Sequence, residues 1–256
     1  MNISVNCPSY RRPKVKSLQY LPFLRVWVDC GEYDEYVKSN KGFEGNIISV
    51  PTGVQGNVAR IRNYILDTEF ARGIDAVVII DDDMRGMFRY DRNNKVVKIE
   101  QEDFIAFIEK YTEMCQELGF KMWGVNVNID RKFYRQFNPF SFSTFIGGPF
   151  SCHLNNTLRY DEDLPLKEDY DLTIQHCNKY RGVLSVNSVF YNVLQSENKG
   201  GCAVYRNRLR EHEQLLALQK KWGSKIVRID ETNWTDGKKK KFEDYNPIIK
   251  IPIKGV

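Results

Sequence analysis

The sequence lacks two patterns that would each define a common kind of site. Its six cysteines show no CxxC or other metal-ligand spacing, so they give no sign of a zinc or iron–sulfur site. A chain of 256 residues needs no disulfide staples. Reduced thiols in a cytoplasmic protein are the simpler interpretation. The segment 8–13 after the first expected strand contains no glycine, which counts against a glycine-rich phosphate loop.

Long apolar runs are also missing. No window approaches the roughly 20 apolar residues of a membrane helix, and no N-terminal stretch resembles a secretion signal. We therefore expect a soluble protein that does not contact a membrane. The net charge of +5 is a mild excess. Basic residues gather in the last third, in Arg206, Arg208, Arg210 and the run Lys238–Lys241, where they could face phosphates or form a solvated surface.

Apolar runs and helical stretches alternate along the first half of the chain, which is typical of an α/β sheet with parallel strands. The expected strands are 3–7, 25–29, 46–50, 76–80, 122–127 and 183–193, and the expected helices are 57–70, 99–118 and 208–222. Hydrophobic residues make up 42% of the chain, enough for one core and hence a single domain. The tail from residue 236 is expected to be coil or an edge strand.

The strand 76–80 is fully apolar and stops at three aspartates, Asp81, Asp82 and Asp83. Burying unpaired charge costs several kcal/mol, so we expect all three at the carboxyl end of the strand, facing water or a cation. Ligands bind at that end of open α/β sheets. Adjacent carboxylates suit Mg²⁺ or Mn²⁺, with Asp81 and Asp83 as ligands to a metal that also binds a diphosphate. A solvated acidic turn would be the simpler explanation.

A second acidic pair, Glu168 and Asp169, precedes an amphipathic stretch and is expected in the first turn of a helix. The helix dipole stabilises carboxylates there, which would explain the pair without any function. The functional interpretation is general base catalysis, in which one carboxylate takes the proton of an acceptor hydroxyl.

Taken in order, four segments resemble the GT-A glycosyltransferases: the segment 8–12 after the first strand, the helix segment 59–63, the aspartates 81–83, and the segment 167–169. The resemblance covers roughly residues 3–195. It implies a GT-A-type, Rossmann-like mixed sheet flanked by helices, with residues 1–195 as the catalytic domain. The C-terminal helix and basic tail, 196–256, would pack on that domain.

The resemblance also implies roles for individual residues. Nucleotide-sugar contacts would come from Pro8, Ser9, Tyr10, Arg11, Arg12, Arg60, Asn63, Asp81 and Asp82. Asp83 would bind the metal with Asp81, and Asp169, beside Glu168, would be the base. Gly147 and Gly148 would shape the acceptor side. Similar enzymes often add a histidine ligand, but His153, His176 and His212 lie in no such motif.

A narrower similarity links the runs 53–67 and 199–202 to the bacteriophage TET-associated glycosyltransferases. It implies a UDP-linked sugar donor and 5-hydroxymethylpyrimidine in phage DNA, such as 5-hydroxymethylcytosine, as acceptor. A protein, a glycan or a small molecule stays open as acceptor. A nucleotidyltransferase and a non-catalytic nucleic-acid-binding module are also compatible with the sequence, which does not define the oligomeric state.

Overall fold

A central mixed sheet organises the fold. The computed structural model describes residues 1–127, 134, 137–193, 200–230 and 245–251. The sheet has the order β3-β2-β1-β4-β9-β7-β10-β5-β6, and β8 pairs with β10. Its strands are β1 (Ile3–Pro8), β2 (Arg25–Asp29), β3 (Ile47–Val50), β4 (Ala76–Ile80), β5 (Met84–Tyr90), β6 (Val96–Ile99), β7 (Met122–Asn126), β8 (Phe140–Ser141), β9 (Phe150–Leu154) and β10 (Leu184–Val193).

The strand directions divide the sheet in two. β3, β2, β1 and β4 are parallel, so their carboxyl ends meet at one edge. β9 runs antiparallel to both β4 and β7, and β5 runs antiparallel to β10 and β6. The predicted fold class, a mixed α/β sheet flanked by helices, is confirmed. The six strands expected from the sequence correspond to β1, β2, β3, β4, β7 and β10, which all run in one direction. The sequence analysis did not expect β5, β6, β8 and β9, which pair antiparallel with their neighbours.

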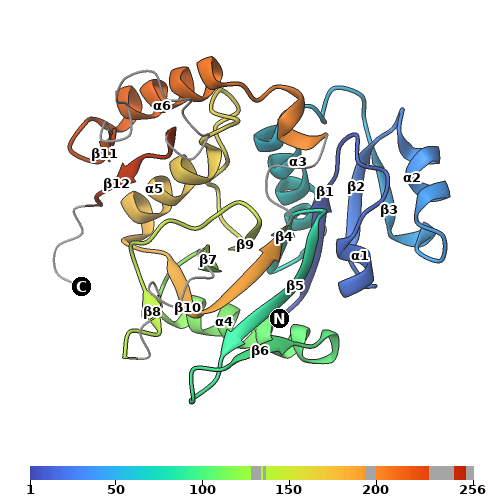
Figure 1. The fold of residues 1–256 in the computed structure, drawn as a ribbon, viewed down its shortest axis with the longest axis horizontal. Coiled ribbons are helices and arrows are strands. Elements are labelled where there is room, and N and C mark those ends of the chain that lie inside the picture. Colours follow the sequence, from blue (N-terminus) through green and yellow to red (C-terminus); the bar gives the residue numbers. More distant parts are fainter. Residues whose placement is uncertain (128–133, 135–136, 194–199, 231–244, 252–256) are drawn as a thin grey trace.

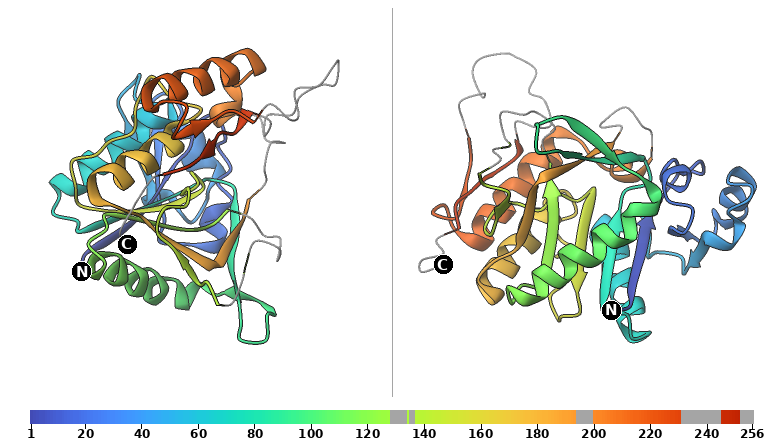
Figure 2. Two further views of the ribbon diagram at one scale, coloured as in Figure 1. Left: turned by 90° about the vertical axis from the view of Figure 1, so that its left-hand side faces the viewer. Right: turned by 90° about the horizontal axis from the view of Figure 1, so that it is seen from below.

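Helices cover both faces of the sheet (Figures 1 and 2). They are α1 (Ser17–Tyr20), α2 (Tyr33–Ser39), α3 (Val58–Ala71), α4 (Gln101–Glu117), α5 (Glu168–Tyr180) and α6 (Arg208–Trp222), with short 3₁₀ turns η1 (Glu44–Asn46) and η3 (Gly201–Val204). One core contains side chains of α1, α2 and α4, and the other contains side chains of α3 and α5. The amino end of α3 is capped by the Asn57 side chain, which accepts from the backbone N–H groups of Ala59 and Arg60.

Helix α6 lies outside this three-layer arrangement and packs on α5. Leu218 of α6 and Ile174 of α5 share a small apolar cluster with Leu164 and Val227. A two-stranded sheet of β11 (Val227–Arg228) and β12 (Ile248–Ile249) follows α6. The expected tail is described only from residue 245, so the run Lys238–Lys241 lies outside the described residues. None of the helices in the described residues is long and apolar enough to span a membrane.

Candidate functional site

A cavity of about 570 Å³ opens at the carboxyl ends of β1 and β4. Segments far apart in the sequence meet there: the loop after β1, the amino end of α3, the aspartates after β4, the amino end of α5, and the segment before α6. The lining residues that carry chemistry are Tyr10, Arg12, Gln55, Asn57, Arg62, Asp81, Asp82, Asp83, Glu168, Asp169, Cys202, Tyr205, Arg206 and Asn246. Both acidic clusters identified in the sequence therefore face one cavity.

Backbone hydrogen bonds from α1 fix the turn that presents the three aspartates. The Asp82 carbonyl accepts from the N–H groups of Lys16 and Ser17, at 2.9 and 3.2 Å. The Ser17 hydroxyl donates to the Asp81 carbonyl at 2.6 Å and accepts from the Met84 N–H at 2.9 Å. This buried serine holds the chain as it leaves β4 and enters β5. The turn is thus positioned by hydrogen bonds from Lys16 and Ser17 to its backbone, and not by its own carboxylates.

Asp82 corrects the expectation that all three aspartates face water or a cation. Its side chain is buried, and it accepts from the Ser9 hydroxyl at 2.6 Å and from Arg12 Nη1 at 2.9 Å. Burial raises the pKa of Asp82, and Arg12 opposes that rise. The cost that excluded burial applies to unpaired charge, whereas this carboxylate has a guanidinium and a hydroxyl as partners. Asp82 therefore anchors the loop after β1.

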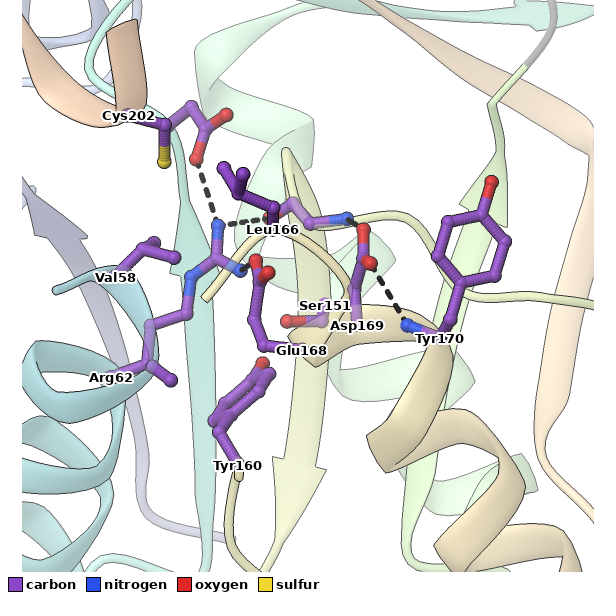
Figure 3. A network of polar contacts seen from close by, with 12 residues as sticks. Val58, Arg62, Ser151, Tyr160, Leu166, Glu168, Asp169, Tyr170 and Cys202 are labelled. Carbon is purple, nitrogen blue, oxygen red and sulfur yellow. Dashed lines mark hydrogen bonds and ion pairs between the residues drawn. The ribbon is translucent and has the colours of Figure 1, made fainter. Parts of the chain in front are cut away.

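Arg62 is the residue that joins the two acidic clusters. Its guanidinium is 3% exposed; Nη2 lies 3.2 Å from Asp81 Oδ1, and Nη1 lies 3.0 Å from Glu168 Oε1. Nη2 also donates to the Gly148 carbonyl at 3.0 Å. The guanidinium carbon lies 5.6 Å from the centre of the Tyr160 ring, so the cation also rests on an aromatic face. Figure 3 shows Arg62 and Glu168 pointing toward one another beside Tyr160.

Glu168 and Asp169 occupy the first turn of α5, as the sequence predicts. Asp169 Oδ2 accepts from the Gly148 N–H at 3.1 Å, and Oδ1 accepts from the Tyr170 N–H at 2.8 Å (Figure 3). These backbone donors hold the Asp169 carboxylate in one orientation.

Burial sets the proton affinity of this pair. Burial and the neighbouring Asp169 raise the pKa of Glu168 to about 8, while Arg62 lowers it. Burial also raises the pKa of Asp169, against the opposing charges of Arg62 and Lys167. A carboxylate whose pKa is raised toward neutrality accepts a proton more readily than an ordinary one. Burial therefore raises the affinity of both carboxylates for a proton.

The loop after β1 sends only part of its sequence into the cavity. Pro8, Tyr10 and Arg12 line it. Ser9 is buried beneath, where its hydroxyl lies 2.9 Å from the Tyr36 hydroxyl. Arg11 has a positive φ of 54°, and its N–H donates to Glu32. The structure thus brings three of the five predicted loop residues to the cavity.

A second wall comes from residues 200–206, which the sequence alone did not place in the site. The Gly201 N–H donates to the Tyr10 carbonyl at 2.8 Å, and Arg12 Nη2 donates to the Gly200 carbonyl at 3.1 Å. A Cβ on Gly200 would lie 2.6 Å from the Arg11 carbonyl oxygen, so only glycine fits this close approach. Cys202, Tyr205 and Arg206 follow and line the cavity. The adjacent glycines Gly200 and Gly201 were the sequence feature that could have indicated this wall.

Other predicted residues lie beside the cavity rather than in its lining. Arg60 is 45% exposed and pairs with Glu162 at 2.9 Å. The Asn63 amide donates to the Tyr160 carbonyl at 2.9 Å. Gly147 packs against Val127 and Tyr191, whereas Gly148 lines the cavity. Arg62 takes the position expected of Arg60. Helical spacing could have indicated that Arg62 is buried. Arg62 lies four residues after Val58 and three before Ile65, on the apolar face of α3.

The carboxylates of the cavity could supply part of the ligand set of a hard divalent cation. Asp81 and Asp83 both line the cavity, and Mg²⁺ or Mn²⁺ can bind through one or two carboxylates, waters and substrate phosphates. In the cavity lining, five carboxylates face three arginines, an excess of acid that a cation would offset. The described part of the chain contains no group of three His, Cys, Asp or Glu residues arranged for a metal. Protein ligands there would number two, with the remaining positions left to water and phosphate.

The histidines do not extend this donor set. His153 is buried, and its Nε2 lies 2.9 Å from the Ser151 hydroxyl and 3.1 Å from the Tyr160 hydroxyl. His176 is buried on α5, and burial lowers the pKa of both residues. His212 lies on α6 against the ring of Tyr245. Within the described residues, none of the three lines the cavity.

Comparisons with known proteins give remote structural likenesses only. No family model matches the chain, and no curated protein matches it. TarS of S. aureus in complex with UDP is 13% identical with a TM-score of 0.49; the match covers 86% of this chain and 65% of that chain, less than two thirds. Glucosyl-3-phosphoglycerate synthase from Mycobacterium tuberculosis, in complex with Mn²⁺, UDP-glucose and phosphoglyceric acid, is 11% identical with a TM-score of 0.47, over 85% of this chain and 79% of that chain. Similarity at this level does not assign an activity.

Proposed function

We propose that this protein is a GT-A-type glycosyltransferase, which moves a hexosyl or pentosyl group from a nucleoside diphosphate sugar, UDP-linked, to a hydroxyl acceptor. One observation carries the proposal: Arg62 joins the strand-end carboxylate Asp81 to the buried pair Glu168 and Asp169 across a single cavity. A strand-end acidic group suits a metal-bound diphosphate. A buried carboxylate with a raised pKa suits proton removal from an acceptor. A group can be transferred between two substrates only when the protein holds both substrates in one cavity.

On the donor side, Asp81 and Asp83 would hold Mn²⁺ or Mg²⁺. When bound, such a cation neutralises the negative charge that develops on the departing diphosphate. Arg12 lies 3.8 Å from Asp83 and 2.9 Å from Asp82, so it fixes these carboxylates from the side of the β1 loop. Tyr10 and the segment around Gln55 line the same end of the cavity and would contact the nucleoside.

On the acceptor side, Asp169 would act as the base. Its Oδ2 is held by the Gly148 N–H, and its carboxylate takes the proton of the acceptor hydroxyl. The acceptor oxygen then forms a bond to the anomeric carbon while the bond from that carbon to the phosphate oxygen breaks. Glu168 stays paired with Arg62 and fixes the charge beside Asp169. The proton thus passes to Asp169, the sugar passes to the acceptor oxygen, and the nucleoside diphosphate leaves.

For the acceptor itself, 5-hydroxymethylpyrimidine in DNA is the proposal that follows from the resemblance of the runs 53–67 and 199–202. The structure supports it only in offering an open cavity of about 570 Å³ at the edge of the sheet. A base in duplex DNA must leave the stack to reach such a site. Proteins, glycans and small molecules are the competing acceptors.

One experiment tests donor, metal and acceptor together. The protein is incubated with Mn²⁺, a panel of nucleotide sugars, and hydroxymethylated or plain DNA, and the digested nucleosides are weighed by mass spectrometry. We expect a hexose or pentose mass gain on hydroxymethylated DNA that EDTA abolishes. Release of UDP is measured in parallel without DNA. A gain on no DNA, with UDP release intact, would reject the DNA acceptor and keep the glycosyltransferase.

Two variants separate catalysis from mere binding. Asp83→Ala should abolish both UDP release and sugar transfer. Asp103→Asn is the control, because Asp103 is an exposed aspartate in the first turn of α4, away from the cavity. If wild-type protein binds nucleotide sugars but never releases UDP with any acceptor, the chain is a binding module and the proposal fails.

A further inference from the structure

A buried ion pair joins α6 to the segment that leads into α5. Lys167 Nζ lies 2.6 Å from Glu211 Oε2, and the two side chains are 1% and 0% exposed. Lys167 directly precedes Glu168 and Asp169 at the start of α5, whereas Glu211 lies in the first turn of α6, where its other oxygen pairs with Arg206. In the part of the chain that the structure describes, Glu211 is the only carboxylate paired with this lysine. A lysine beside the acidic pair thus has its counter-ion on another helix.

Other contacts hold α6 against the same segment. At the carboxyl end of α6, Trp222 Nε1 donates to the buried Asp171 carboxylate at 2.7 Å. Near the middle of α6, the Gln214 amide donates to the Asp163 carbonyl at 2.8 Å. The packing of α6 on α5 therefore does not depend on the ion pair alone, and variants of the ion pair keep these contacts.

The base of the proposed reaction requires positive charge nearby. A carboxylate takes a proton from the acceptor only while it is ionised, and burial raises the pKa of Asp169. Two cations oppose that rise, Arg62 of α3 and Lys167. Arg62 pairs with carboxylates of the cavity, Asp81 and Glu168. Lys167 differs, because the carboxylate that holds it lies outside the cavity lining, so its charge does not depend on what the cavity binds.

We propose that Lys167 is a positioning residue that keeps Asp169 ionised for catalysis, and that Glu211 of α6 holds Lys167 in its charged form. The inference rests on the proposed function, because it concerns the base of that same site. A buried ammonium without a counter-ion tends to lose its proton, since desolvation favours the neutral amine. The Glu211 carboxylate opposes this loss. In this way α6 contributes to proton transfer at α5, although Glu211 does not line the cavity.

Among the other groups that face Asp169, only Glu168 changes its charge near neutral pH. Arg62 keeps its charge, because arginines stay protonated in proteins, and its second nitrogen holds Asp81 of β4. Three tyrosines stay neutral, because burial raises the pKa of each: Tyr160, Tyr170 and Tyr191. Burial and Asp169 raise the pKa of Glu168 to about 8, so the two carboxyl groups titrate together. The acid limb of a pH–rate profile therefore reports this pair, and a shift of the limb reports the charge of Lys167.

The test is the pH profile of kcat/KM for UDP release by the full chain, with saturating Mn²⁺, water as the acceptor, and the UDP-sugar that is hydrolysed fastest. Lys167→Met should move the acid limb to higher pH by about one unit, because loss of the cation raises the proton affinity of the acidic pair. Activity should fall about tenfold below the limb and recover above it. Lys167→Arg should keep the wild-type limb. Lys220→Met, an exposed lysine of α6, is the control.

Glu211→Gln separates two ways in which this carboxylate could act. If only its own negative charge acted on the acidic pair, its removal would move the limb to lower pH. If it holds Lys167 charged, its removal moves the limb to higher pH, as Lys167→Met does. Adding Lys167→Arg to Glu211→Gln should cancel that upward shift, since arginine stays charged without a counter-ion. Glu213→Gln, an exposed residue of α6, is the control.

The outcomes for the inference and for the proposed function are distinct. Circular dichroism checks that each variant is folded, and if either Lys167→Met or Glu211→Gln does not fold, the other decides by itself. An unmoved limb in Lys167→Met, or a limb moved to lower pH in Glu211→Gln, would overturn the inference and leave the proposed function intact. No UDP release by the wild type with any nucleotide sugar or acceptor would overturn both.

Discussion

Arg62 Nη1 donates to Glu168 Oε1 at 3.0 Å, and both side chains are shielded from water. The same guanidinium reaches Asp81 and the Gly148 carbonyl, so a residue of α3 bonds to the end of β4, to the loop before β9 and to the start of α5. A single cation therefore connects the two acidic clusters.

Arg62→Met should unfold more easily than the wild type, because it leaves the buried Glu168 carboxyl and the Gly148 carbonyl without their hydrogen-bond donor. The expected loss of unfolding free energy is about 2 to 4 kcal/mol. Urea denaturation followed by circular dichroism measures it. Arg60→Met is the matched variant two residues earlier, and its exposed pair with Glu162 should be worth about 1 kcal/mol or less. Similar losses in the two variants would contradict the role given to Arg62.

Asp169→Asn should keep the fold and lose catalysis. Asparagine keeps an acceptor oxygen for one of the two backbone donors, the N–H groups of Gly148 and Tyr170, but cannot take a proton from the acceptor. We expect kcat to fall by a factor of about 10² to 10⁴, with the donor KM little changed. Steady-state UDP release measures both constants. Asp103→Asn serves again as the control, and an unchanged kcat in Asp169→Asn would exclude this residue as the base.

The contribution of Glu168 to the unfolding free energy should fall as the pH rises through the neutral range, against the opposite contributions of the buried His153 and His176, whose pKa values are lowered. The pKa of Glu168 is raised from 4.5 in the free residue to about 8 by burial and by Asp169, so the folded protein holds a proton that the unfolded chain has lost. Between these values the native state binds more protons, and each pH unit lowers the unfolding free energy by at most about 1.4 kcal/mol.

Glu168→Gln should remove this slope, so the variant gains stability relative to the wild type as the pH rises from about 5 to 8. Denaturant midpoints across that pH range give the comparison. Glu102→Gln, in the first turn of α4 and exposed, should follow the wild-type curve. Equal slopes in the wild type and in Glu168→Gln over this window would show that Glu168 is ionised in the folded protein.

Gly200→Ala should weaken the cavity wall. Its φ of +102° is unfavourable for alanine, and the added Cβ would lie 2.6 Å from the Arg11 carbonyl oxygen and 2.7 Å from Arg12 Cγ. Gly53→Ala is the control, since Gly53 has a φ of +89° but open space around it; its cost should be about 1 to 2 kcal/mol. Melting temperature and UDP titration should both separate the two variants, with only Gly200→Ala losing UDP affinity.

Elements with a regular apolar pattern could be predicted from the sequence. β4 is the clearest, because its five residues are all buried and all apolar. α3 and α6 follow from helical spacing and from asparagine caps. The acidic ends of β4 and α5 could also be found, because consecutive carboxylates stand out in any sequence.

The rest of the fold and of the site depends on contacts between residues that lie far apart in the sequence. β9 is fully buried yet contains Ser151 and His153, which bond to each other inside the sheet, so its pattern does not indicate a strand. The burial of Asp82 and of Arg62 could not be predicted for the same reason. Their partners lie 70 and 106 residues away in the chain, Arg12 for the first and Glu168 for the second. Burial of a charge can be foreseen only when its partner is known.

The late position of Gly200, Tyr205 and Arg206 in the chain has a consequence for biosynthesis. These residues leave the ribosome after every strand of the large sheet, yet they form one wall of the cavity. A nascent chain that has completed β10 would hold both acidic clusters with that side still open to water. Donor binding should therefore begin only after residues 200–206 have emerged and closed that side of the cavity.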